Sequence, residues 1–234
     1  FFFLMIRRPP RSTPLYSSAQ RQMCIRDREK ALDAALIAPN SSNMQPWEFY
    51  WVRTPEKKAA LVEACFSQPA AKTAQELLVA VARIDTWKRN NQLMKEALSK
   101  MEKVPRSATE YYEKLVPLMY RQGFMGWRGR LFGLGVFFAG FFRPVPRGPF
   151  GIHALEEVVI KTTALACENF MLSIVAQGFD TCPMEGLDES RVKKVLGLKC
   201  GARVVMGLAV GRRDPSGIYS ERIRFNEKLF VHEV

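Results

Sequence analysis

Histidine and paired cysteine, the residues from which many metal centres are built, are scarce in this sequence. Its 234 residues include two histidines, His153 and His232, so we expect no histidine-based metal centre and no Ser-His-Asp site. The five cysteines are odd in number, widely spaced and without a Cys-x-x-Cys pair. This usage argues against a disulfide framework or a zinc site, and it indicates a reducing compartment, which we take to be the cytoplasm.

Acidic residues are outnumbered by basic ones. The chain has 35 lysines and arginines against 23 aspartates and glutamates, which gives a formal net charge of +12 at pH 7. This balance favours an anionic partner, such as nucleic acid, an acidic membrane surface or phosphorylated small molecules. Because no basic run is interleaved with aromatic residues, we expect no nucleic-acid partner. A solvated basic surface accounts for much of the excess.

The first 27 residues lack the hydrophobic periodicity of the rest. They begin FFFLMIRRPPRST, and QMCIRDR follows later; neither string has the period of a helix or a strand. Both resemble translated sequencing-adapter DNA. We therefore expect residues 1–27 to be a non-native leader that lies outside the folded domain. Residues 28–234 are expected to form a single domain.

The remaining sequence alternates between helical and strand patterns. The stretch 77–84 reads LLVAVARI and predicts a strand buried on both faces. A long apolar helix of about 40 Å is predicted over 152–177, and it must be central or interfacial. Further helices are predicted at 29–38, 54–66 and 189–196, and further strands at 47–53 and 203–210. The pattern favours an α+β fold, a central sheet flanked by helices in an α/β sandwich.

Residues 87–150 differ in character and are expected to form a variable insertion. Two polar-faced helices are predicted at 87–103 and 109–119. Residues 131–142 (LFGLGVFFAGFF) are all apolar or glycine, but they are too short to span a bilayer, which needs about 20 residues. Buried packing is the favoured interpretation of this segment. A lid over a substrate and contact with a membrane surface are the alternatives.

Two polar turns carry the most specific functional signal. The first, at residues 38–47, reads Ala-Pro-Asn-Ser-Ser-Asn-Met-Gln-Pro-Trp, and the second, at 182–188, reads Cys-Pro-Met-Glu-Gly-Leu-Asp. Each follows an apolar element with small and polar residues that expose the backbone. The pair resembles the two flavin-contacting loops of the nitroreductase family, which are FMN-dependent NAD(P)H oxidoreductases. The resemblance covers residues 28–83 and 152–234.

The resemblance implies a set of cofactor-binding residues. In the first loop it assigns contacts to the ribityl chain, phosphate or ring of FMN, partly across a dimer interface. In the second loop a main-chain N–H points at flavin N5, and small residues let the ring approach. A late pair of arginines matches the residues that grip the phosphate, and Gln68 is a weaker candidate near the pyrimidine edge. The implied residues are Asn40, Ser41, Asn43 and Gln45, then Pro183, Glu185 and Gly186, and finally Arg222 and Arg224.

The resemblance also implies how the protein works. It suggests a homodimer with the long helix at the interface, exchanged C-terminal extensions and FMN between the subunits. No catalytic side chain is required, because the flavin takes hydride from NAD(P)H and the electron acceptor then uses the same slot in a ping-pong reaction. Nitroaromatics, quinones or similar electron-poor compounds are the expected acceptors. Two alternatives are other flavin chemistry, such as reductive dehalogenation or dehydrogenation, and a non-catalytic, basic, membrane-peripheral module.

Overall fold

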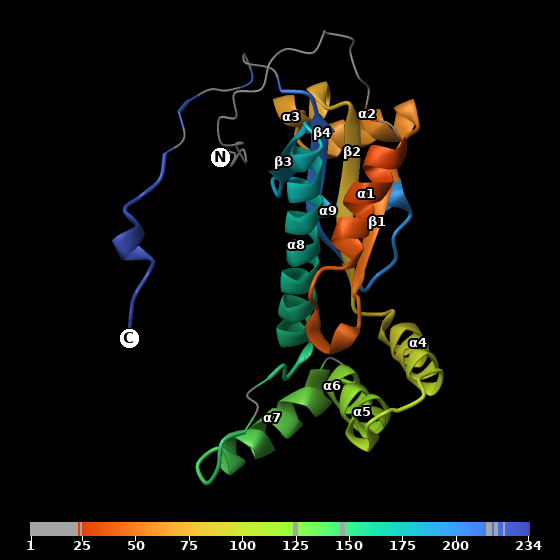
Figure 1. The fold of residues 1–234 in the computed structure, drawn as a ribbon, viewed down its shortest axis with the longest axis vertical. Coiled ribbons are helices and arrows are strands. Elements are labelled where there is room, and N and C mark those ends of the chain that lie inside the picture. Colours follow the sequence, from red (N-terminus) through yellow and green to blue (C-terminus); the bar gives the residue numbers. More distant parts are fainter. Residues whose placement is uncertain are drawn as a thin grey trace.

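A four-stranded antiparallel sheet forms the middle layer of the protein (Figure 1). The computed structural model describes residues 23, 25–123, 126–145, 148–213, 217, 220–221 and 223–234. The strands lie in the order β1-β2-β4-β3. Their bounds are Trp47–Val52 for β1, Glu76–Arg83 for β2, Asp180–Met184 for β3 and Ala202–Gly211 for β4.

Strand β2 shows why the sheet needs helices on both faces. Because successive side chains of a strand point to opposite faces, its apolar run supplies two buried surfaces at once. Leu78 and Ala80 belong to the core beneath α1 (Ile25–Leu36) and α8 (Ile152–Ala176). Alternate residues of β2 face the second core, under α2 (Pro55–Ala64), α3 (Pro69–Thr73) and α9 (Glu189–Leu196). The predicted α+β class and the burial of this strand on both faces are confirmed.

Helix α8 is the largest element, and it packs on the sheet through aromatic contacts. The Phe170 ring is fully buried, with its centroid 6.5 Å from that of Phe49 and 6.3 Å from that of Trp51. The Asn169 side chain donates to the carbonyl oxygen of Ala34 at 3.1 Å, which ties α8 to α1. Helix α1 begins at Ile25 and so includes the last three residues of the proposed leader.

Two elements of the sandwich itself were not predicted from the sequence. Helix α3 has five residues, too few to show a period. Strand β3 contains Pro183, and proline argues against a strand because it donates no ladder hydrogen bond. The structure places β3 at the edge of the sheet, where proline is tolerated.

The insertion lies at one end of the sandwich (Figure 1). It contains α4 (Trp87–Ser99), α5 (Arg106–Glu110), a π-helical turn (Tyr111–Leu115), α6 (Val116–Tyr120) and α7 (Trp127–Ala139). A separate apolar cluster joins this end to the rest, and its buried members are Met44, Tyr112, Val116, Tyr120 and Leu155.

The expectation that residues 131–142 are buried is wrong for this chain. Phe138 is 57% exposed and Phe142 is 90% exposed, with several neighbours similarly open. Among the described residues, α8 alone is long and apolar enough to cross a membrane, and half of that stretch is buried, as in a core helix.

The start of α8 is tied to the sheet by an ion pair whose strength should depend on pH. Arg203 on β4 donates from Nε and Nη2 to Glu156 Oε1 at 3.0 and 2.7 Å. Burial alone would raise the pKa of Glu156, but hydrogen bonds and charge from Arg203 and His153 hold it below its ordinary value of 4.5. The pair therefore stabilises the fold at pH values above 4.5, and this contribution is lost as the pH falls through the lowered pKa.

We expect Glu156→Gln to reduce the free energy of unfolding by about 1 kcal/mol at neutral pH. The difference from the parent protein should shrink below pH 4.5, because the parent then loses the same charge. Urea denaturation across this pH range is the measurement. Glu157→Gln is the control, since Glu157 pairs with Lys161 at 3.2 Å on an exposed face and should change stability by only about 0.3 kcal/mol. A loss for Glu156→Gln that does not vary with pH would contradict this assignment.

Candidate functional site

The first loop, between α1 and β1, has an unusual backbone. Ser42, Asn43 and Gln45 have φ angles of 56°, 46° and 44°, in the left-handed region that non-glycine residues seldom adopt. A short 3-10 turn, Ser41–Asn43, lies within it. Three such residues in one loop are costly, and strain of this kind concentrates where a backbone is held for binding.

Contacts from the insertion hold this loop from beneath. The Met44 side chain is fully buried, and Asn90 on α4 donates from Nδ2 to the Met44 carbonyl oxygen at 2.8 Å. The hydroxyls of Ser42 and Tyr111 share a hydrogen bond of 2.5 Å, and Tyr112 donates to the Ser42 carbonyl oxygen at 3.0 Å. The strained loop is therefore rigidly supported on one side.

The other side of the loop is open. Ser41, Asn43 and Gln45 are exposed and form a polar surface. Asn40 is half-buried and shapes the loop, because its Oδ1 accepts from the Gln45 main-chain N–H at 2.9 Å and its Nδ2 donates to Asn43 Oδ1 at 3.3 Å. The predicted binding residues of this loop lie together, and Asn43 also donates from Nδ2 to the Met94 Sδ of α4 at 3.3 Å.

The second loop follows β3 directly. Glu185 is exposed and Gly186 is half-buried. The Gln68 Nε2 donates to the Gly186 carbonyl oxygen at 2.5 Å, and a Cβ atom on Gly186 would lie 3.2 Å from the same nitrogen. Asp188 donates its main-chain N–H to the Ala64 carbonyl oxygen at 2.8 Å. The turn is thus fixed to the end of α2 and to the segment before α3.

Several polar groups of the second loop have no partner of their own. Within the described ranges, the main-chain N–H groups of Glu185 and Gly186 find no acceptor. The buried Oε1 of Gln68 also lacks a hydrogen-bond partner among those residues. Free N–H donors in an exposed turn are suited to an acceptor atom on a ligand.

Nearby thiols do not supply a nucleophile. Burial raises the pKa of Cys65 to about 11 and that of Cys182 to about 11. Both are therefore neutral thiols at physiological pH, and a neutral thiol is a poor nucleophile. The chemistry of the second loop therefore does not depend on a thiol nucleophile.

Arg83 lies below the first loop but is not available to a ligand. It donates its main-chain N–H to the Pro46 carbonyl oxygen at 2.7 Å, and its guanidinium binds Asp85 at 2.9 Å and Glu48 at 2.5 Å. The hydrogen bond to Asp85 and the charge of Glu48 raise the pKa of Arg83 despite its partial burial. This arginine closes the end of the β1–β2 pair and is already neutralised.

The structure does not bring the two loops together within one chain. The first loop leads into β1 and the second leaves β3, and these strands are the two edges of the sheet. Two strands separate them, so the edges lie roughly 14 Å apart at the usual spacing of about 4.8 Å. Helices also cover both faces of the sheet between them (Figure 1).

Arg224, the described member of the late basic pair, is not brought to either loop. Arg222 lies outside the described residues. Arg224 is exposed, and its Nη1 donates to the carbonyl oxygen of the adjacent Ile223 at 2.8 Å. Its segment belongs to a C-terminal tail that extends away from the sandwich and carries a 3-10 turn, Glu227–Leu229 (Figure 1).

Sequence reasoning missed the residues that support the loops. Asn90 and Tyr111 lie in the insertion, at least 45 positions from the loop they hold. Gln68 is 118 positions from Gly186, and the resemblance gave only a weak indication of it. The sequence offered one signal for these supports. Asn90 and Asn91 are uncharged amides at buried positions of a helix, and a buried amide needs a hydrogen-bond partner.

Comparisons with known proteins give consistent matches over most of the chain. The sequence model of the nitroreductase family matches residues 26–116 and 153–212. The chain is 27% identical over 194 residues to an NADH dehydrogenase of Thermus thermophilus, covering 82% of this chain and 78% of the relative. It is 22% identical to an oxygen-insensitive NADPH nitroreductase of Helicobacter pylori, covering 79% and 75%.

Solved structures share the fold. A nitroreductase family protein of Streptococcus pneumoniae superposes with a TM-score of 0.65 at 19% identity, covering 92% of each chain. An Exiguobacterium sibiricum protein solved in complex with FMN superposes with a TM-score of 0.64 at 21% identity, covering 92% of this chain and 89% of the other.

Proposed function

The chain belongs to the nitroreductase family, and from this premise we propose that it reduces nitroaromatics, quinones or similar electron-poor compounds with FMN and NAD(P)H. The FMN-bound neighbour and the names of the relatives support the cofactor and the co-substrate. The free thiols of Cys65, Cys167, Cys182 and Cys200 support a reducing compartment, the cytoplasm.

The observation that carries this proposal is the second loop. Its Glu185 and Gly186 N–H groups have no acceptor among the described residues, they follow a strand end, and Gln68 holds the turn through the Gly186 carbonyl oxygen. A flavin needs such a donor at N5 and an approach free of side chains, which Gly186 provides. The unpartnered Gln68 Oε1 offers an acceptor for a polar edge of the same ring system.

We propose that a homodimer completes the site. The first loop of one protomer would then meet the second loop of its partner, which removes the separation imposed by the sheet. The exposed face of α8 supports this arrangement, because Leu165 and Leu172 lie seven residues apart on one side and are each 51% exposed. The tail also exposes Phe225, Leu229 and Phe230, and it extends from the body as an exchanged arm would (Figure 1).

In this site the protein's contribution is binding and orientation. FMN, when bound, supplies the redox chemistry by passing a hydride from NAD(P)H to the acceptor. Ser41 and Asn43 would hold the ribityl chain and phosphate by hydrogen bonds. The Glu185 N–H would hold the acceptor nitrogen of the ring, and Arg224, carried by the tail, would neutralise the phosphate. No side chain of the two loops is required to move a proton.

The absorption spectrum of the purified protein tests this function. We expect a yellow protein with flavin bands that bleach on addition of NADH or NADPH and return with a nitroaromatic or a quinone. Steady-state rates should give parallel double-reciprocal lines, because both substrates use one slot in turn. A haloaromatic in the same assay tests the alternative of reductive dehalogenation. A protein reconstituted with FMN that consumes no NAD(P)H with any acceptor would contradict the proposal.

A further inference from the structure

An exposed apolar stripe runs along α7. Its residues lie at positions i, i+4, i+7 and i+11, which places them on one side of the helix. Each is more than half exposed, and Phe141 and Phe142 extend the surface just beyond the helix end. The stripe consists of Trp127, Leu131, Leu134 and Phe138. Contiguous apolar surface of this kind marks a binding face.

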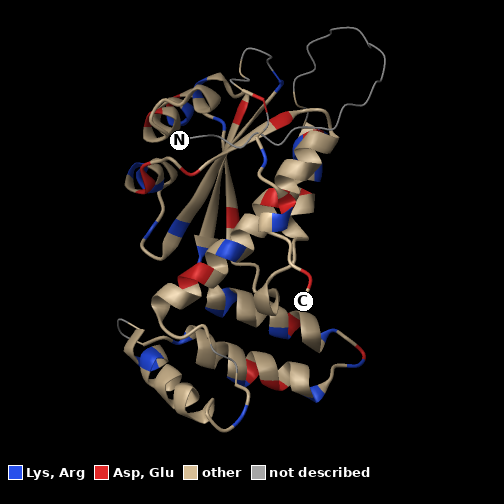
Figure 2. Ribbon diagram, turned by 90° about the vertical axis from the view of Figure 1, so that its left-hand side faces the viewer, with Lys and Arg blue, Asp and Glu red and all other residues tan. Residues whose placement is uncertain are grey.

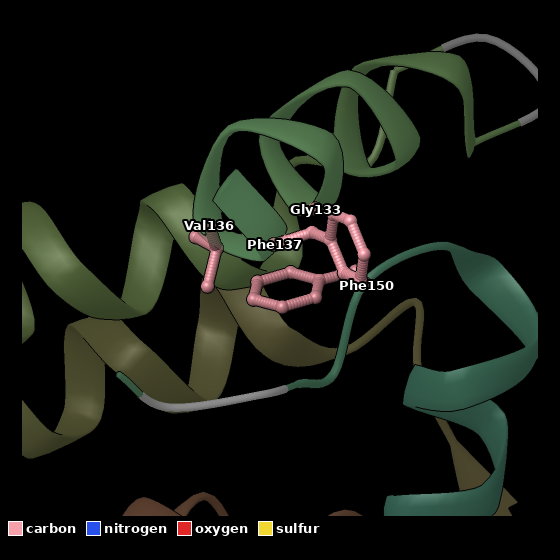
Figure 3. Close-up of a pocket in the computed structure, with 4 residues that line it drawn as sticks. All are labelled: Gly133, Val136, Phe137 and Phe150. Atoms are coloured by element: carbon pink, nitrogen blue, oxygen red, sulfur yellow. The ribbon is translucent and has the colours of Figure 1, made fainter. Parts of the chain in front are cut away.

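The side of α7 opposite the stripe packs against the rest of the chain. A Cβ on Gly129 would lie 1.9 Å from Gln122 Oε1, and one on Gly133 would lie 3.0 Å from the Phe150 Cβ. The absence of side chains there lets α7 approach the 150–151 segment closely. Figure 3 shows Phe150 against this side of the helix, with Val136 and Phe137 beside an apolar depression of about 200 Å³. The stripe therefore faces away from the rest of the chain.

The charges around the stripe all have one sign. Residues 115–155 contain no aspartate or glutamate and five arginines, at positions 121, 128, 130, 143 and 147. In the part of the chain that the structure describes, Arg128, Arg130 and Arg143 are exposed and form no ion pair. Arg128 and Arg130 lie in the first turn of α7, between Trp127 and Leu131 of the stripe, and Arg143 follows the end of the helix. Figure 2 shows the body of α7 without charged residues, whereas the neighbouring helices carry both signs.

We propose that α7 docks on an anionic phospholipid surface, lying in its plane with the stripe buried among the upper acyl chains. A helix of 13 residues is about 20 Å long, so arginines at both ends can reach lipid phosphates together. Trp127 at one end suits the boundary between headgroups and acyl chains. A second copy of the chain is the weaker occupant, because this basic face would meet its own like charges. The proposal concerns the exposed side of α7, which belongs to neither loop, and it stands apart from the flavin chemistry.

Vesicle co-sedimentation of the full chain tests the proposal. We expect binding to vesicles of phosphatidylcholine with phosphatidylglycerol, and much weaker binding to phosphatidylcholine alone. Raising the salt from about 0.1 M to about 1 M shortens the Debye length from about 10 Å to about 3 Å and should release most of the protein. No binding to anionic vesicles at the lower salt concentration would overturn the proposal.

Variants of α7 separate the apolar from the electrostatic part. Leu134→Ser and Phe138→Ser should each weaken binding about tenfold or more. Arg128→Gln and Arg143→Gln should each weaken binding about fivefold on anionic vesicles and leave neutral vesicles unaffected. Phe138→Trp, which keeps an apolar ring, should retain binding and shift its fluorescence to shorter wavelength when vesicles are added.

Leu93→Ser and Met101→Ser are the controls, since these residues are 55% and 60% exposed elsewhere in the insertion. They should bind like the parent chain. Equal losses in these controls would overturn the assignment to α7, as would an unshifted Phe138→Trp emission. A change of oligomeric mass in Phe138→Ser without vesicle binding by the parent would assign the stripe to a contact between copies instead.

Discussion

Gly186→Val is expected to purify without bound flavin and to bind added FMN at least about a hundredfold more weakly than the parent chain. This corresponds to about 2.7 kcal/mol. The turn at Glu185 and Gly186 presents its free N–H groups on a surface that a flat ring must approach closely. Two methyl groups on Gly186 would stand between the ring and those donors. Fluorescence titration of FMN is the measurement.

The fold should survive this substitution. The nearest atom to a new Cβ is the Gln68 Nε2 at 3.2 Å, the end of a flexible side chain that can yield by a few tenths of an ångström. Gly135→Val is the matched control, because nothing lies within 4 Å of a Cβ at that position on α7. Unchanged FMN affinity in Gly186→Val would remove the second loop from the site.

The largest effect of all is expected from Leu165→Glu combined with Leu172→Glu. These leucines share an exposed side of α8, and an interface there would bury both. Replacing two buried apolar side chains with unpaired carboxylates should weaken association at least about a thousandfold, or about 4 kcal/mol. We expect a monomer in sedimentation experiments and, because the flavin site is shared, loss of FMN as well.

The monomer should remain folded, since neither leucine is in the core. Far-ultraviolet circular dichroism and the urea midpoint should stay close to the parent values. Leu93→Glu combined with Met101→Glu supplies the control, with two exposed apolar side chains changed in the same way on another face. A double variant at Leu165 and Leu172 that is monomeric yet retains FMN would show that one chain is sufficient for the site.

Sequence patterns predicted the elements that are defined by neighbouring residues, such as a helix with its capping residues or a strand with a continuous apolar run. Helix α9 is capped at its start by Asp188, whose Oδ1 accepts from the Arg191 N–H at 3.1 Å, and at its end by Gly197, which has a φ of 68°. Strand β4 was similarly visible as an apolar run. Strand β3 was hidden by Pro183, because the rule against proline does not apply at an edge that only the full sheet order reveals.

The exposure of residues 131–142 could not be predicted from the sequence, for a different reason. Apolar composition shows that a segment avoids water, but it does not specify what covers the segment. In this chain glycines fix one side of α7 and leave Leu131 and Phe138 exposed. The candidate site shows the same limit, since the loops were recognisable from sequence while their supports at Gln68 and Asn90 depend on distant contacts.

The central claim is that the first loop of one protomer and the second loop of its partner form one flavin site. Ser41 is exposed, so Ser41→Glu should repel the FMN phosphate without disturbing the fold. Chains carrying Ser41→Glu or Gly186→Val should each form colourless homodimers. A mixed dimer, isolated with two different tags, would keep one pair of intact loops across the interface.

The flavin content of this mixed dimer is the most direct measurement. Our account predicts one FMN per mixed dimer, with NAD(P)H oxidation restored to about half of the parent rate if the two sites act independently. A mixed dimer that is as colourless as the two homodimers would contradict the account, because it would place both loops of each site in the same chain.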